Sequence, residues 1–472
     1  SILQKKRISV RFFCVFLAYM QIILYLCTAK CSRMEKEQFT SRFGVIMATA
    51  AGAVGLGNIW KFPYMLGQNG GAAFLVVYIV CVLLFGLPLM ITEIVIGKRS
   101  GQSVRGAYQV LIGNRRWNGI PILTCLTVTL IIGVYLVITG WCVKYLLMSI
   151  VGPLPTLNGW TDVLCNAFAV LCSVAVVWLG VTKGIERLSK IFMPILLLII
   201  VILLVRVMLL PGAKEGLSFL FSFDADKISF DVILSALGQC FYSLSIGMGA
   251  LITYGSYIPK KQNVVTTACG IVAVDTLVAV MSACVIMPAV FIYGFSPEQG
   301  PKLVFSVLPV VFEQMPGGHV MALLFFALLC IAAITSIVSL FEVLTASLVD
   351  VTAHRERRPL TRHQALVYVA VVCLAISGFC TFSMTGESDW LVWRGKTLFD
   401  GLDVLTSSFM LPMVALSTVI FFGWFVDKQV MIEEMKPHYG TKPWAIQGYY
   451  FLIRWCFPIL ILLIGLNSIG II

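Results

Sequence analysis

The chain has 472 residues, of which 59% are hydrophobic and only 12% are charged. With a mean hydropathy of +0.96, this composition excludes an ordinary soluble domain and indicates a polytopic helical membrane protein. We attribute the net charge of +12 to basic loops on one side of a membrane rather than to nucleic-acid binding. The 15 cysteines and four histidines lack the CxxC and HExxH spacings, so the sequence predicts neither a disulfide framework nor a zinc site.

Residues 1–33 combine a basic cluster with an apolar run from Val10 to Cys27, a pattern typical of a signal or anchor segment. The alternative that we favour is translated upstream sequence with initiation at Met34. A cleaved signal or a single added span would leave Met34 outside the cytoplasm, contrary to the charge distribution below. We therefore expect one membrane domain over residues 34–472.

From Met34 onward, apolar runs predict eleven membrane-spanning helices. They lie near residues 41–63, 72–97, 120–150, 164–181, 188–210, 230–257, 263–293, 319–349, 364–384, 398–426 and 447–470. Basic residues gather in alternate loops, for example Lys98, Arg99 and Arg105 after the second span. By the positive-inside rule, residue 34 lies in the cytoplasm and the C-terminus outside.

Two of these spans are interrupted by glycines. The first span contains Gly52, Gly55 and Gly57, and the sixth contains a glycine- and hydroxyl-rich stretch over residues 238–249. Glycine weakens a helix, and backbone groups freed inside a bilayer must line a cavity or bind a ligand. Breaks at corresponding positions predict a five-plus-five inverted repeat. The repeats would cover about 41–210 and about 230–426, followed by an eleventh helix at about 447–470.

Residues 34–472 resemble a bacterial member of the neurotransmitter:sodium symporter family. The LeuT-type fold of this family is a well-known example of two helices broken at corresponding positions. The resemblance is carried by AVGLGNIWKFPY at residues 53–64, by Asn69-Gly70-Gly71 and by the run from Ser245 to Ser256. It implies an all-α polytopic fold with helices 1 and 6 unwound at mid-membrane. Eleven helices, instead of the family's usual twelve, are similar to several bacterial members. The implied function is sodium-coupled import of a hydrophobic or aromatic L-amino acid across the cytoplasmic (inner) cell membrane, without enzymatic activity.

The resemblance implies two Na+ sites built from oxygen ligands, which a hard cation prefers. The first would use the carbonyl of Ala53, the side chains of Asn58, Ser243 and Asp275, and the substrate carboxylate. The second would use the carbonyls of Ala51, Val54 and Ala332 with the hydroxyls of Thr335 and Ser336. For these two hydroxyls, hydrogen bonding to their own helix is the alternative.

Asp275 stands alone in the apolar run 271–277. An intramembrane carboxylate is a functional candidate by default, and a structural bond to a neighbouring helix is the alternative. Animal relatives that need chloride have a neutral residue here. We therefore expect the charge of Asp275 to replace chloride, with Tyr78, Gln239 and Ser243 as the remnant of the chloride site, and we predict no chloride requirement.

The resemblance also implies a substrate pocket. Gly55 stands where amine-transporting relatives have an acid, which leaves room for a carboxylate held by the N–H groups of Leu56 and Gly57 and the hydroxyl of Tyr135. The predicted pocket residues are Ala53, Gly55, Leu56, Gly57, Ile131, Tyr135, Tyr242, Ser243, Ser245, Met248, Ser336, Ser339 and Leu340. Met248 replaces the phenylalanine of a leucine-specific relative and favours Trp, Tyr, Phe and Leu as substrates; plain packing is the alternative for this residue.

Two gates complete the expectations from the resemblance. Lys61 and Asp403 would close the outer path, and Lys36, Asp350 and Tyr257 the inner path; for Lys36, a solvated surface charge is the alternative. The partners expected are the amino acid, sodium and the bilayer, with no nucleic acid. Two other functions stay open: a proton-coupled amino-acid transporter of the same fold, and a ligand-binding membrane sensor or channel.

Overall fold

The structure is a computed structural model that describes residues 37–112, 117, 119–152, 159–297, 303–352, 360–384, 392–393, 396–435 and 443–468. The helices in these ranges are α2 (Arg42–Ala53), α3 (Phe62–Gln68), α4 (Ala72–Cys81), α5 (Leu87–Ser100), α6 (Val104–Ile112), α7 (Gly119–Val151), α8 (Trp160–Trp178), α9 (Arg187–Met208), α10 (Ala213–Phe221), α11 (Phe230–Ser243), α12 (Ala250–Gly255), α13 (Val264–Ile292), α14 (Leu308–Gln314), α15 (Gly318–Thr352), α16 (Arg362–Met384), α17 (Leu398–Val404), α18 (Leu411–Trp424), α19 (Lys428–Met435), α20 (Pro443–Phe451) and α21 (Phe457–Ser468). One short antiparallel pair, β1 (Val392–Trp393) and β2 (Lys396–Thr397), precedes α17.

Several helices join through π-helical turns, and proline explains most of these turns. The described residues contain η1 (Gly57–Lys61), η2 (Val82–Gly86), η4 (Val181–Glu186), η6 (Leu303–Val307), η8 (Leu405–Met410) and η10 (Leu452–Cys456). All except η4 end two residues before a proline. Because proline lacks an N–H and its ring crowds the carbonyl four residues earlier, the preceding turn widens while the helix continues.

Nine single helices in the described ranges are long and apolar enough to span a membrane. A tenth span is the pair Arg42–Ala53 and Gly57–Gln68, which is bent by 55°, and α11 with α12 forms an interrupted eleventh. The all-α fold with eleven spans is therefore confirmed.

Two predicted boundaries are wrong. The first span continues past Pro63 to Gln68, because the turn before Pro63 widens into η1 and the helix continues from it as α3. The fifth begins at Val181 rather than 188, because η4 extends it.

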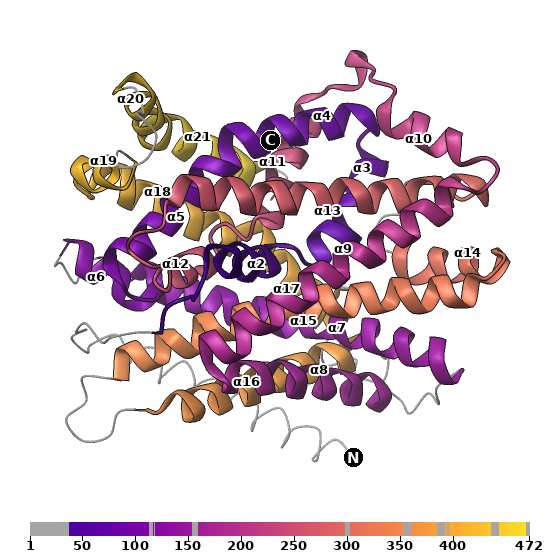
Figure 1. Cartoon of the computed structure of the whole chain (residues 1–472), viewed down its shortest axis with the longest axis horizontal. Helices are drawn as coiled ribbons and strands as arrows, with labels where there is room; N and C mark the ends of the chain where they lie inside the picture. Colours follow the sequence, from indigo (N-terminus) through magenta and orange to yellow (C-terminus); the bar gives the residue numbers. More distant parts are fainter. Residues whose placement is uncertain are drawn as a thin grey trace.

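The broken first helix lies at the centre of the molecule, where α2 contacts α9, α13 and α15 (Figure 1). Residues 47–53 of α2 are all buried, and most of them are alanine or glycine, which lets neighbouring helices approach closely. Short helices lie at the two ends of the bundle, α6 and α19 at one and α10 and α14 at the other (left and right in Figure 1). The bundle thus packs against α2 and places its broken end in the buried interior.

Candidate functional site

The break after α2 redirects hydrogen bonds that would otherwise continue the helix. The N–H of Gly55 donates to Asn58 Oδ1 (3.2 Å) and that of Leu56 to the Tyr135 hydroxyl (2.9 Å). The N–H of Asn58 turns back to the carbonyl of Gly55 (3.1 Å). In a continuous helix these three N–H groups would bind the carbonyls of Ala51, Gly52 and Val54. Those carbonyls are therefore released from the helix ladder and are available to other donors or to a cation.

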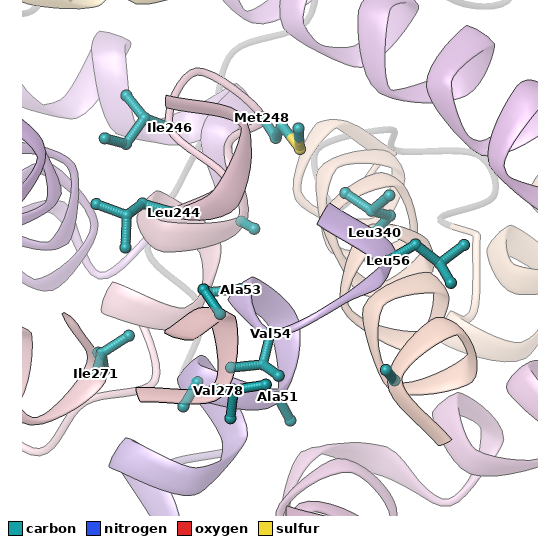
Figure 2. Packing of buried hydrophobic residues seen from close by; sticks show 14 of the residues in the cluster. Ala51, Ala53, Val54, Leu56, Leu244, Ile246, Met248, Ile271, Val278 and Leu340 are labelled. Carbon is teal, nitrogen blue, oxygen red and sulfur yellow. The ribbon is translucent and has the colours of Figure 1, made fainter. Parts of the chain in front are cut away.

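The second break lies beside the first. It covers residues 244–249, between α11 and α12. Ser245 adopts a positive φ of 53°, which is unusual for a residue other than glycine. Its hydroxyl donates to the freed carbonyl of Gly52 (3.3 Å). Figure 2 shows side chains from both breaks in one cluster, with Met248 pointing toward the helix that carries Leu340.

Three of the residues predicted for the first sodium site converge between the breaks. The Asn58 amide donates to Ser243 Oγ (2.9 Å) and to Asp275 Oδ1 (2.9 Å). Ser243 Oγ donates to Asp275 Oδ2 (2.7 Å). Asn58, Ser243 and Asp275 are each at most 1% exposed. The cluster buries a carboxylate and a hydroxyl, which are ligand types that Na+ prefers. Asn58 turns its NH2 group toward them, while its Oδ1 accepts the N–H of Gly55.

The residues predicted as a chloride-site remnant adjoin this cluster. The Tyr78 hydroxyl donates to Ser243 Oγ (3.2 Å), and the Gln239 amide donates to the carbonyl of Gly57 (2.9 Å). Gln239 Oε1 is buried without a hydrogen-bond partner among the described residues. Both side chains are almost fully buried, and Tyr78 is connected to Asp275 through Ser243.

The residues predicted for the second sodium site come from α2 and α15. Ser336 Oγ lies 3.5 Å from the carbonyl of Val54. The Thr335 hydroxyl donates to the carbonyls of Ile331 (2.9 Å) and Ala332 (3.0 Å), which is the back-bonded geometry that the sequence left open. A hydroxyl that donates in this way keeps lone pairs for a cation, so the arrangement fits either interpretation.

A small cavity of about 20 Å³ lies among the predicted substrate residues. Its lining contains ten of the thirteen predicted residues, together with Gly52, which the sequence reasoning missed: Gly52, Ala53, Gly55, Gly57, Ile131, Tyr135, Tyr242, Ser245, Met248, Ser336 and Leu340. The other three do not line the cavity. Leu56 binds Tyr135 through its N–H, Ser243 faces Asp275, and Ser339 accepts a hydrogen bond from Tyr254 (2.8 Å).

A larger cavity of about 790 Å³ adjoins this pocket, and Ile131, Tyr135 and Tyr242 line both. Lys61 and Asp403 also line the larger cavity, but the described residues contain no ion pair between them. Lys61 Nζ instead lies 4.0 Å from the centre of the Tyr242 ring, and Asp403 accepts a hydrogen bond from Ser407 (3.2 Å). Tyr242 is thus one of three residues at the boundary between the two cavities, and Lys61 lies over its ring.

The predicted inner gate is described only in part, because Lys36 lies outside the described residues. Asp350 accepts hydrogen bonds from the N–H (2.9 Å) and the hydroxyl of Ser103. The Tyr257 hydroxyl donates to Glu342 Oε1 (2.5 Å), and Arg362 forms an ion pair with Glu342. Sequence reasoning missed this pair of Glu342 and Arg362.

Glu93 on α5 was also missed. It is 2% exposed, and its Oε1 accepts the N–H of Gly247 (2.7 Å) in the second break. Glu93 and Glu342 both stand in apolar runs, so the rule that singled out Asp275, an acid inside a span, could have found them.

The chain resembles known proteins over nearly its whole length. The family model described as "Sodium:neurotransmitter symporter family" matches residues 36–168 and 159–471. A sodium-dependent transporter of Bacillus subtilis (strain 168), YhdH, is 34% identical over 93% of this chain and 99% of its own length. A GABA transporter of Drosophila melanogaster described as sodium- and chloride-dependent is 25% identical over 90% of this chain and 50% of its own. The crystal structure of MhsT in complex with L-phenylalanine has a TM-score of 0.81 and 35% identity, covering 92% of this chain and all of that one.

Proposed function

Because the chain belongs to the sodium:neurotransmitter symporter family and is a multi-pass, sodium-dependent symporter, we propose that it imports a hydrophobic or aromatic L-amino acid by alternating access. Two sodium ions would be coupled to each substrate, with no requirement for chloride. The observation that carries the proposal is the buried cluster of Asn58, Ser243 and Asp275 beside two broken helices.

The cluster supports coupling because the substrate carboxylate would itself be a ligand of the first sodium ion. Gly55 and the Tyr135 hydroxyl adjoin the first break, so a substrate carboxylate there would face the Asn58 and Asp275 oxygens. Two ions crossing ~100 mV with a tenfold gradient supply roughly 7 kcal/mol. This is enough for roughly a 10⁵-fold accumulation of a neutral zwitterion.

The substrate class follows from the pocket lining. Ile131, Met248 and Leu340 supply apolar walls, while the polar groups gather near Gly55 and Ser336. The solved relative MhsT holds L-phenylalanine, which favours a bulky side chain here as well. A cavity of about 20 Å³ is smaller than any of these amino acids, so binding requires Tyr242 or Met248 to move.

The remaining expectations are part of the same proposal. Residue 34 would face the cytoplasm and the C-terminus the outside of the cell membrane, with residues 34–472 forming one transport domain. Lys61 and Asp403 would meet when the outer cavity closes. Lys36, Asp350 and Tyr257 would form the inner gate, with Glu342 and Arg362 supporting Tyr257.

The test is uptake of tryptophan, tyrosine, phenylalanine and leucine into proteoliposomes, with sodium or choline outside and chloride or gluconate as the anion. We expect accumulation against a gradient with sodium and either anion. Uptake driven equally well by a proton gradient in choline would indicate the proton-coupled alternative. Sodium-dependent binding without accumulation would indicate a sensor. Loss of uptake in gluconate would overturn the chloride-independent part alone.

A further inference from the structure

Arg454 is an arginine inside the last membrane span. It lies in η10, eight residues after the start of the span Ile446–Asn467. Its guanidinium lies 4.5 Å from the centre of the Trp424 ring and 5.9 Å from that of Trp455. The described residues provide no hydrogen-bond acceptor or acidic partner for this guanidinium, and its Nε is buried without a partner. An arginine within a span is costly unless its charge is compensated.

A backbone hydrogen bond fixes one of the two indoles, and the second indole packs against the first. Pro458 has no N–H, so the carbonyl of Arg454, four residues earlier, loses its helix donor. The indole N–H of Trp424 donates to that carbonyl (3.1 Å). The rings of Trp424 and Trp455 meet edge to face, with 4.9 Å between their centres. The guanidinium thus lies against two rings that contact each other, and one of these rings is fixed by its bond to the Arg454 carbonyl.

The site lies on the outer surface of the helix bundle, near the end of α18. Trp424 is the last residue of α18, 44% exposed, and Trp455 is 49% exposed. Tryptophan at a helix end is typical of the membrane–water boundary, where headgroups lie. A second cation, Lys428 Nζ, lies 5.3 Å from the centre of the Tyr450 ring, and Tyr450 is one helical turn from Arg454. The Tyr450 hydroxyl donates to the carbonyl of Gly423 (3.0 Å), which binds this turn to α18.

We propose that Arg454, held against Trp424 and Trp455, binds the phosphodiester of an anionic phospholipid, with Lys428 as a second contact for the headgroup. Arginine presents a planar fork of N–H donors that matches phosphate oxygens in a bidentate manner. A phospholipid headgroup at the membrane–water boundary, which the two indoles indicate, supplies a negative charge to pair with Arg454. The site lies outside the transport pathway and does not depend on the substrate or coupling proposed above.

Native mass spectrometry of the detergent-purified full chain, titrated with phosphatidylglycerol, tests the proposal. We expect one lipid to bind the unaltered chain about tenfold or more tightly than it binds Arg454→Gln, as the loss of a charge-assisted bidentate contact implies. Arg454→Lys, which keeps the charge but not the fork, is expected to lie between the two. The control is Arg206→Gln, because Arg206 lies at the end of another span and already donates to the carbonyl of Pro316 (2.8 Å). It should bind the lipid like the unaltered chain.

Gel filtration of each variant would establish that it is folded, and Trp424→Leu gives a second route to the same answer, with weaker lipid binding expected. Equal lipid binding by the unaltered chain, Arg454→Gln and Trp424→Leu would overturn the proposal. Competition by excess glycerophosphoglycerol or inorganic phosphate would also overturn it, since the site would then take a soluble phosphate rather than a lipid.

Discussion

Asp275 is the residue on which the sodium proposal depends most. Its two carboxylate oxygens accept hydrogen bonds from Asn58 and Ser243, and it is fully buried. Asp275→Asn keeps the shape but removes the charge, so we expect sodium to bind about tenfold or more weakly. If the charge replaces chloride, adding chloride should recover part of the loss.

The measurement is sodium titration of substrate binding, in chloride and in gluconate. Asp231→Asn is the control, because Asp231 lies exposed in the first turn of α11. Unchanged sodium affinity in Asp275→Asn would show that the carboxylate is a structural hydrogen-bond acceptor.

A substitution at Gly55 tests the proposed substrate pocket. A Cβ at this position would lie 2.5 Å from Ser336 Oγ and 2.7 Å from the Tyr135 hydroxyl. Gly55→Ala must therefore displace groups proposed to hold the second sodium and the substrate carboxylate. We expect substrate binding to weaken by at least about tenfold, equivalent to ~1.4 kcal/mol.

Equilibrium binding of labelled tryptophan or leucine in sodium measures this effect. Gly378→Ala provides the control, because a Cβ there meets nothing within 4 Å and alanine favours the helix. Normal binding in both variants would remove Gly55 from the pocket.

At the scale of elements, periodicity and glycine content predicted the spans and both breaks, because these features are local. The contact between Asn58 and Asp275 spans 217 positions, and no local pattern specifies it; it was predicted only through the family resemblance. The proline-linked π-helical turns were not predicted, although Pro88, Pro412 and Pro458 stand in the sequence. A proline inside a long apolar helix can end it or widen one turn, and the packing around it decides which occurs.

The pair of Glu342 and Arg362 joins α15 to α16, and Tyr257 joins it to the end of α12. Glu342 is fully buried, whereas the Arg362 side chain is 26% exposed. Removing one partner of a buried ion pair costs ~3–5 kcal/mol, and we expect about 2 kcal/mol for Glu342→Gln because solvent screens the exposed arginine.

The apparent melting temperature in detergent, followed by intrinsic fluorescence, reports this loss. Arg362→Gln combined with Glu342→Gln should recover part of the stability, because the double variant leaves no unpaired charge. A double variant as unstable as the sum of the single ones would mean that the two residues act independently.

At the scale of the whole molecule, ion pairs between α5 and α19 join parts that alternating access would move apart, and the pair of Lys98 and Glu434 is the most buried of them. For the alternating access proposed above, we expect the bundle of spans 1, 2, 6 and 7 to rock against the other spans. Lys98 belongs to α5, in helix 2, and it donates to the carbonyl of Gln262, between helices 6 and 7 (2.8 Å). It also pairs with Glu434 on α19 (2.7 Å), which follows helix 10. Lys98 therefore connects the moving bundle to the rest of the protein at one end of the molecule.

Opening that end must stretch or break the bond to Glu434, so the pair should favour the closed inner side. Lys98 and Glu434 are only 7% and 12% exposed, whereas Arg99 and Glu433 beside them are 40% and 54% exposed. Exposed ion pairs contribute about 0–1 kcal/mol. We therefore expect Glu434→Gln to raise the inward-open population several-fold, and Glu433→Gln to change it little.

Spin labels at positions 260 and 364, both exposed near this end of α12 and α16, would follow the opening by the distance between them. Without sodium, the population with the longer distance should be larger in Glu434→Gln than in the unaltered chain, and sodium should reduce it in both. Equal populations in Glu434→Gln and Glu433→Gln would show that the buried pair stays intact while the inner side opens. In that case α19 would move together with helix 2, and the boundary of the moving bundle would have to include it.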